Sequence, residues 1–363
     1  MMHSTLSASS ASMIVDATVR DQRKTGREQS IRLPVLDFIK GALVLIMVLY
    51  HWWNYFISPL GAVYKYLRFL TPSFIFISGF LVSHVYLARP AVDRLKTAKR
   101  LTQRGFKILA VFVSLNLVRT FLIPDVRSGI MPSQAWSLKN LTAIYLTGNV
   151  SAAGTGKAAA FYILVPISYL LLVSAGLILA TRLYKDIFKI AGPLLLLAVF
   201  VLDLCGLQYG NLELLAIGLL GVTTGYLSLD TIENLLKYRA LLVMAYLSYL
   251  VVITMWNVTY PIQIVGVFLN LLLLYLLGVS AAGKGTVGAV AILLGKYSLF
   301  GYIAQIAILQ VLYRGVRPLR LGLGVLPVSF CAAFALTIIG VELLNRARGR
   351  VALLDRLYRA VFA

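Results

Sequence analysis

Long apolar runs follow one another through most of this sequence. A helix needs about 20 apolar residues to cross the hydrocarbon core of a bilayer. About ten runs come close to or exceed that length, at 38–57, 68–87, 106–123, 158–180, 187–204, 210–227, 240–256, 260–278, 289–312 and 325–344. The sequence therefore predicts an all-α fold: a polytopic integral membrane protein whose single bundle holds about ten transmembrane helices.

The composition supports this class and excludes others. Of the 363 residues, 60% are hydrophobic and 13% are charged, which excludes a soluble globular domain of this size. The net charge of +21 could indicate nucleic-acid binding, but the basic residues lie between apolar runs, as the positive-inside rule predicts. We therefore expect the lipid bilayer, and no nucleic acid, as a partner. Cys205 and Cys331 lie in or beside apolar runs and indicate neither a metal site nor a disulfide.

The distribution of Lys and Arg predicts the topology and the domain boundaries. Residues 1–30 are polar, rich in Ser and without the apolar core of a signal peptide, so we expect a disordered cytosolic arm. The bundle is expected over 31–345 and a basic cytosolic tail over 346–363. Both tails and the basic segment 89–107 fall on one side if the number of spans is even. This predicts a protein of the cell (inner) membrane with both termini in the cytoplasm. Three cations contradict the pattern, because this topology places them on the non-cytoplasmic side of the membrane: Arg314, Arg317 and Arg320.

A polar stripe crosses the first apolar run. Lys40 and His51 are eleven residues apart, which is about 1100°, or roughly three turns plus 20°, so they share one helix face. Asp37 and Asn54 lie on the same stripe. Ionisable groups at membrane depth are functional-site candidates, because burying them is costly. With the N-terminus inside, Lys40 lies at the inner edge and His51 in the outer half of the membrane.

The chemistry of His51 has two interpretations on the residues alone. A neutral imidazole in a partly dry cavity is a good general base, because its pKa lies near the working pH. Alternatively, His51 belongs to an interfacial belt with its neighbours Trp52 and Trp53. The residues leave both open.

The surrounding motifs resemble those of the acyltransferase-3 family and related membrane acyltransferases, such as glucan succinyltransferases and heparan-glucosaminide acetyltransferases. Leu36-Asp37, Lys40-Gly41 and His51 resemble the Leu-Asp, Arg-Gly and His signature of that family, with Lys40 in place of Arg. Lys keeps the charge but lacks the bidentate fork of Arg. Three later stretches are also similar: the Phe-rich Ser78-Gly79-Phe80 segment, Arg104-x-x-Lys107, and Gly295-x-x-Ser298-Leu299-x-x-Tyr302, which is followed by Gln305 where family members often carry His.

This resemblance implies a membrane-embedded enzyme. An acetyl- or succinyl-like group would pass from cytoplasmic acyl-CoA to a hydroxyl or amine of an extracytoplasmic glycan or cell-envelope acceptor. His51 would be the general base or a transient acyl carrier, with Asn54 and Asp37 completing the catalytic set. The acyl-CoA would be held by Lys40, Arg100, Arg104, Lys107, Ser78 and Gln305. Acyl-CoA is then a substrate, and neither a bound cofactor nor a metal is expected.

Two other classes remain open. In a transporter or flippase, Asp37, Lys40 and His51 would form a proton or substrate path, although the sequence has no evident inverted repeat. A non-catalytic sensor or scaffold could also keep the bundle, since Lys stands for Arg at positions 40 and 107. The basic segment 89–107 likewise has two interpretations: phosphate binding, or ordinary topology with contacts to anionic lipid.

Overall fold

A computed structural model describes residues 34–57, 64–87, 93–122, 137–148, 160–181, 186–227, 229–256, 258–281, 285–316 and 324–362. The expected arm, 1–30, and two of the three exceptional cations, Arg317 and Arg320, lie outside these residues. Throughout the described parts of the chain the structure is helical and contains no strand, so the all-α prediction is confirmed there.

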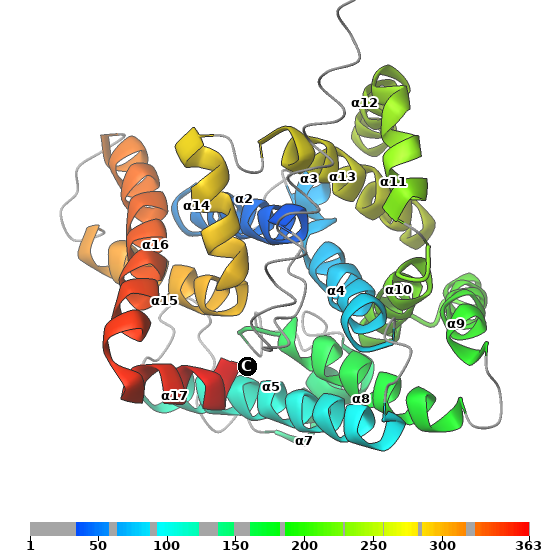
Figure 1. The fold of residues 1–363 in the computed structure, drawn as a ribbon. Coiled ribbons are helices and arrows are strands. Elements are labelled where there is room, and N and C mark those ends of the chain that lie inside the picture. Colours follow the sequence, from blue (N-terminus) through cyan, green and yellow to red (C-terminus); the bar gives the residue numbers. More distant parts are fainter. Residues whose placement is uncertain are drawn as a thin grey trace, which may run out of the picture. The chain divides into compact units, whose positions relative to one another are not determined.

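The described helices are distributed along the chain from Pro34 to Phe362 (Figure 1). Their bounds are α2 Pro34–Phe56, α3 Tyr64–Leu67, α4 Leu70–Leu81, η1 Val82–Leu87, α5 Arg94–Leu122, α7 Leu138–Thr142, η2 Ala143–Thr147, α8 Leu164–Ala180, α9 Ile187–Leu204, α10 Gly210–Thr224, α11 Leu229–Leu235, η3 Leu236–Tyr238, α12 Arg239–Met255, α13 Tyr260–Ala281, α14 Gly285–Lys296, α15 Ser298–Val316, α16 Val325–Arg350 and α17 Ala352–Phe362.

Seven helices among the described residues are long and apolar enough to cross a membrane: α2, α3 to η1 taken together, α5, α9, α13, α15 and α16. The prediction of ten spans is therefore wrong in number. The run 289–312 is two helices that meet at Tyr297, and the first of them, α14, has only 12 residues. The helices in three other runs, α8, α10 and α12, have 15 to 17 residues. The length of an apolar run alone detects neither the break at Tyr297 nor the shorter helices.

The basic segment before the third span is also different from the prediction. Most of it lies between the expected spans 68–87 and 106–123, but Arg94–Lys107 forms the first half of α5, which continues without interruption to Leu122. Likewise, residues 346–350 continue α16, and most of the expected tail forms α17. The charged ends of these helices extend the apolar spans as regular helix.

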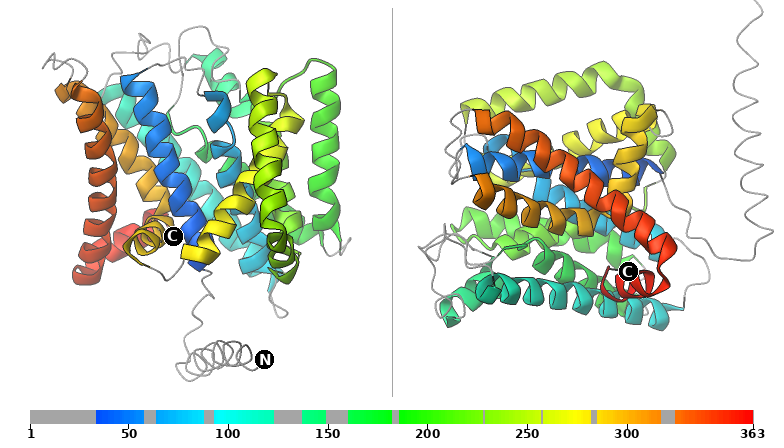
Figure 2. Two further views of the ribbon diagram at one scale, coloured as in Figure 1. Left: turned by 90° about the horizontal axis from the view of Figure 1, so that it is seen from above. Right: turned by 90° about the vertical axis from the view of Figure 1, so that its left-hand side faces the viewer.

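Helix α9 shows the kind of surface that a membrane protein presents to lipid. It lies at the edge of the bundle (Figures 1 and 2) and packs mainly on α10. Five apolar side chains at helical spacing are at least half exposed: Ile190, Leu194, Leu197, Val201 and Leu204. In water such a continuous apolar face would drive association. Its exposure here supports a membrane-embedded protein.

Close crossings hold the centre of the bundle together. A side chain at Gly79 of α4 would overlap the carbonyl of Gly218 on α10. A side chain at Gly41 of α2 would overlap the carbonyl of Ala291 on α14, and one at Gly295 would overlap the carbonyl of Asp37. Small residues let membrane helices approach this closely, and dispersion contacts and backbone packing then stabilise the crossing.

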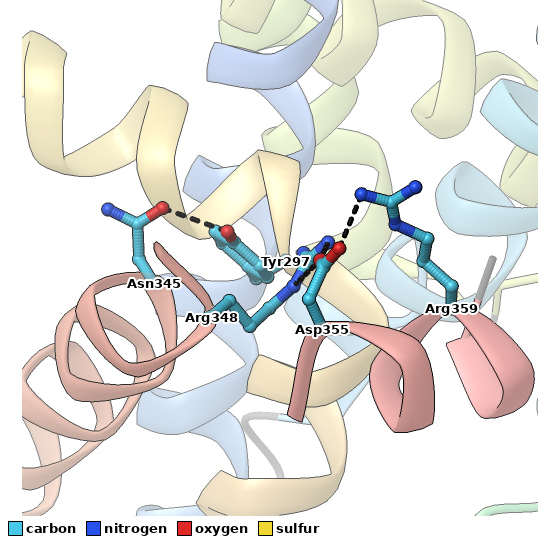
Figure 3. A network of polar contacts seen from close by, with 5 residues as sticks. All are labelled: Tyr297, Asn345, Arg348, Asp355 and Arg359. Carbon is cyan, nitrogen blue, oxygen red and sulfur yellow. Dashed lines mark hydrogen bonds and ion pairs between the residues drawn. The ribbon is translucent and has the colours of Figure 1, made fainter. Parts of the chain in front are cut away.

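Helix α17 is fastened to the end of α16 by a polar network (Figure 3). Arg348 donates from Nε and Nη2 to Asp355 Oδ1 at 3.0 and 2.5 Å, and Arg359 pairs with the other carboxylate oxygen. The Arg348 guanidinium also lies 5.3 Å from the ring centre of Tyr297, whose hydroxyl donates to Asn345 at 2.8 Å. These bonds connect α17 to the break between α14 and α15.

We expect the docking of α17 to depend on pH. Hydrogen bonds from Arg348, and then from Arg359, lower the pKa of Asp355 below its ordinary value, which is about 4. A lowered pKa stabilises the docked state above that value, and the stabilisation is lost as the pH falls through the lowered pKa. Hydrogen exchange of residues 352–362, corrected for its intrinsic pH dependence, should therefore rise below about pH 4.

The same measurement at neutral pH provides the control. Asp355→Asn should raise exchange in α17 at pH 7, because both arginines lose their carboxylate partner. Asp186→Asn removes another carboxylate, which pairs with Lys189 in an exposed ion pair, and should leave α17 unchanged. Equal protection of α17 in wild type and Asp355→Asn would refute this role of the network.

Candidate functional site

A cavity lies among α2, α4, α5, α8 and α15, and we name it the Lys40 cavity. Its volume is about 160 Å³. Most of its wall is apolar, and the polar side chains that reach it are Lys40, Ser78, Tyr86, Arg104, Ser298 and Tyr302. Sites for organic ligands commonly combine an apolar wall with a few polar groups that fix orientation. Helices from both halves of the chain are needed to close it.

The charged end of this cavity is built by α2 and α5. Lys40 Nζ lies 2.6 Å from Asp37 Oδ1, and the two side chains are only 19% and 13% exposed. Arg104 donates from Nη1 to the hydroxyl of Tyr86 at 3.4 Å. The carboxylate of Asp37 balances the charge of Lys40, whereas the partner of Arg104 is a neutral hydroxyl. This end of the cavity therefore keeps a net positive charge and favours an anion.

A row of tyrosines leads away from the Lys40 cavity toward His51. Tyr302 lines the cavity and lies within electrostatic range of Tyr50. The Tyr50 ring lies 5.0 Å from the His51 ring and 5.8 Å from that of Tyr64. Tyr50 also shares a side-chain hydrogen bond with Asn54. His51 and Asn54 are thus gathered around Tyr50, near the end of α2.

A second cavity begins at the other end of this row, and we name it the Trp256 cavity. Its volume is about 490 Å³, and it is lined by Tyr64, Lys65 and Arg68 on one side and by Thr254, Met255, Trp256 and Val258 on the other. Tyr64 lines this cavity as Tyr302 lines the first. Tyr50 therefore neighbours one tyrosine in the wall of each cavity, and His51 lies beside Tyr50 without lining either cavity.

A strained residue packs against Tyr302, which lines the Lys40 cavity. Phe161 has a φ of +58°, a conformation that costs free energy for a bulky side chain. Its ring packs edge-on against Tyr302 at 5.8 Å. Asn116 of α5 fixes the preceding residue, Ala160, by accepting from its N–H at 2.9 Å and donating to its carbonyl at 3.0 Å. These two bonds hold Phe161 where it supports Tyr302.

The structure separates the predicted site residues into groups. Lys40, Ser78 and Arg104 are brought together in one cavity. Arg100 and Lys107 lie on the exposed surface of α5 and do not line it. Asp37 pairs with Lys40, and it lies 14 residues from His51, about 21 Å along the helix. Asp37 is therefore placed to balance the charge of Lys40, and it does not reach the imidazole.

Gln305 has a different environment from the other predicted ligands. It is fully buried, and among the described residues neither its amide nitrogen nor its amide oxygen has a hydrogen-bond partner. One turn before it, Gly301 faces Val44, and one turn after it, Leu309 packs with Val48. Gln305 therefore faces the contact between α15 and α2 and does not line either cavity. A buried amide without partners is costly, which makes this position unusual.

Tyr50, Tyr64, Lys65 and Arg68 were not among the predicted site residues. Only one local signal pointed to Tyr50, namely its i, i+4 spacing from Asn54, which allows their hydrogen bond. The contact between Tyr50 and Tyr64 depends on how α3 follows α2. The partners of Lys65 and Arg68 lie about 190 positions further along the chain, so no local pattern indicates them.

Comparison with known proteins adds no relative. No family model matches this chain, and neither the curated proteins nor the solved structures include a match.

Proposed function

We propose that the protein is a membrane-embedded acyltransferase that moves an acetyl- or succinyl-like group from acyl-CoA to a glycan or cell-envelope acceptor. One observation carries the proposal: His51, a residue suited to acid–base catalysis, lies beside Tyr50, which neighbours a tyrosine in the wall of each of the two cavities. A two-substrate reaction needs such a place, where a donor and an acceptor approach one catalytic group from different sides. The family resemblance of the α2, α4, α5 and α15 motifs agrees with it.

In this proposal the Lys40 cavity receives the donor from the cytoplasm, in a cell (inner) membrane with both termini on the cytoplasmic side. A volume of about 160 Å³ is small beside the several hundred Å³ of a typical ligand pocket. It therefore suits the acyl and thioester end of the donor and leaves the nucleotide outside. Arg100, Arg104 and Lys107 follow i, i+4, i+7 spacing on α5 and share one face. They would hold the phosphates, together with Lys40.

The chemistry is then a general-base acyl transfer. The His51 imidazole takes the proton of the acceptor hydroxyl or amine as that atom attacks the thioester carbonyl. The new ester or amide bond forms, the C–S bond breaks, and the CoA thiolate leaves and takes up a proton. Asn54, beside Tyr50, is a donor for the oxyanion that develops on the carbonyl. A transient acyl-histidine would use the same residues in two steps.

A transporter or flippase is the second candidate, and the same pair of cavities favours it. A substrate that passes His51 would enter one cavity and leave by the other. The two functions differ in a direct test. Purified protein incubated with radiolabelled acetyl-CoA or succinyl-CoA should release CoA and transfer or hydrolyse the acyl group. If it does neither, while reconstituted vesicles show a flux that depends on His51, the enzyme proposal fails and the transporter stands.

The donor site can be tested through its cations. We expect Arg104→Ala to raise the KM for acyl-CoA about tenfold to a hundredfold, because a charge-assisted hydrogen bond contributes about 1.5–3 kcal/mol. The kcat should change much less, since Arg104 is remote from His51. Arg104→Lys should recover part of the loss. Steady-state kinetics with varied acyl-CoA measure both constants.

Arg94→Ala is the matched control. Arg94 belongs to the same basic half of α5 but is absent from the cavity wall. Its replacement should leave the KM within about twofold of wild type, since surface substitutions change free energies by about 0.5 kcal/mol or less. An equal rise in KM for Arg94→Ala and Arg104→Ala would show a diffuse electrostatic effect, and the assigned site would be wrong.

A further inference from the structure

The Trp256 cavity has a composition that the donor chemistry does not explain. Two cations, Lys65 and Arg68, line one side, and two exposed aromatic rings, Tyr64 and Trp256, line the cavity with them. Its volume of about 490 Å³ lies within the range of cavities that bind small organic ligands, roughly 300–1,000 Å³. Tyr64, which lines this cavity, lies 5.8 Å from the Tyr50 ring, and Tyr50 lies beside His51, so two tyrosines separate a molecule bound there from the imidazole.

The two cations are held in place by backbone oxygens. Lys65 Nζ donates to the carbonyl of Thr254 at 3.1 Å, and Arg68 Nη1 donates to that of Val258 at 2.8 Å. An ammonium has three donors and a guanidinium has five, so each of these bonds uses only one. Within the described parts of the chain neither cation forms an ion pair with a carboxylate. Arg68 acts electrostatically on Glu213 without forming an ion pair with it. The cavity therefore keeps positive charge for a ligand.

The aromatic rings provide a flat apolar surface beside these charges. Trp256 is 64% exposed and Tyr64 is 50% exposed. Tryptophan and tyrosine at membrane interfaces also occur as lipid belts. Here, however, the rings line one cavity together with two oriented cations. A sugar ring has an apolar C–H face that packs on an aromatic plane, while its acidic substituent accepts hydrogen bonds from Lys and Arg.

We propose that the Trp256 cavity binds the acceptor, and that this acceptor is an anionic saccharide. The sugar ring lies on Trp256, a carboxylate or phosphate group is held by Lys65 and Arg68, and a hydroxyl points past Tyr64 toward His51. The role as acceptor site rests on the acyltransferase proposal, whereas the binding of an anionic saccharide can be measured without any acyl donor.

The test is calorimetric titration of the full chain in phosphatidylcholine nanodiscs. The probes are a galacturonic acid disaccharide, glucose 6-phosphate, glucose and inorganic phosphate. We expect at least one of the two acidic saccharides to bind about tenfold or more tightly than both glucose and inorganic phosphate. The disaccharide and the sugar phosphate distinguish a carboxylate from a phosphate as the acidic group. Equal binding of glucose, or of inorganic phosphate alone, would overturn the proposal.

Variants locate the binding. Trp256→Ala removes an exposed side chain and should not disturb folding, and we expect it to weaken binding about tenfold. Arg68→Gln should weaken it about tenfold to a hundredfold. Lys237→Gln and Tyr238→Ala change an exposed cation and an exposed aromatic ring elsewhere and should have no effect. If Trp256→Ala binds like wild type, the site is wrong. If phosphatidylglycerol nanodiscs abolish saccharide binding, the cavity holds a lipid headgroup and the saccharide assignment is overturned.

The outcome also separates this inference from the proposed function. Saccharide binding that depends on Trp256 and Arg68, without any acyl-CoA hydrolysis or transfer, would keep the saccharide site and reject the enzyme. Acyl transfer that is unchanged in Trp256→Ala and Arg68→Gln would keep the enzyme and reject this acceptor site. In the expected case both variants raise the KM for the acceptor.

Discussion

Replacing His51 by alanine is expected to reduce acyl transfer from acyl-CoA about a hundredfold to ten-thousandfold, which is the usual contribution of a general acid–base group. The KM for acyl-CoA should change little, since Lys40, the proposed donor ligand on α2, lies eleven residues from His51, about 16 Å along the helix. The kcat, measured with radiolabelled acetyl-CoA at saturating donor, is therefore the constant to follow. Asn54→Ala should reduce the kcat less, because it removes one hydrogen-bond donor and leaves the base.

His84→Ala is the control for this experiment. His84 is the other histidine in the described part of the chain; it stacks on Phe80 at 5.6 Å and does not line either cavity. Its replacement should leave the kcat near the wild-type value. If His84→Ala and His51→Ala lose activity alike, the loss reflects folding and His51 has no special role. Mass spectrometry of protein quenched during turnover distinguishes direct transfer from an acyl-histidine, which would add the acyl mass to the peptide containing His51.

The sequence predicts the helical class well because hydrophobicity over about 20 residues is a strong signal. It does not predict the number of long helices. The break at Tyr297 lies inside an apolar run, and its flanking residues, Lys296 and Ser298, hardly change the average hydrophobicity. The break follows from packing: Gly295 crosses the backbone of Asp37, which belongs to a helix some 250 residues earlier in the chain.

The site is predictable to the extent that it depends on α2 and on the similar motifs. Lys40, Ser78 and Arg104 come from three motifs, and the structure places all three in one cavity. The structure also gives the motif glycines a physical role, since Gly41 and Gly295 lie at one helix crossing. The Trp256 cavity could not be predicted, because it forms only where the end of α12 meets α3. No local spacing connects Trp256 with Lys65.

A substitution at the crossing of α2 and α14 should have a large effect on stability. Gly295→Ala is expected to destabilise the bundle by about 3 kcal/mol or more, because even a methyl group would overlap the carbonyl of Asp37, and backbone cannot move aside as a side chain can. The apparent midpoint of thermal unfolding should fall by about 5 °C or more. The change would also shift the Asp37–Lys40 pair relative to Ser298, so the KM for acyl-CoA should rise in the protein that still folds.

Gly340→Ala makes the same chemical change in α16, at a position where an added methyl group meets no atom within 4 Å. Alanine favours a helix over glycine by about 1 kcal/mol, so this variant should be neutral or slightly more stable, opposite in sign to Gly295→Ala. Gly41→Ala should act like Gly295→Ala, since it meets the carbonyl of Ala291 at the same crossing. Either substitution alone would push α2 and α14 apart, so the second methyl group enters a space that the first has already opened. The double variant should therefore lose clearly less stability than the sum of the single losses. Strictly additive losses would mean that the two glycines do not share one crossing.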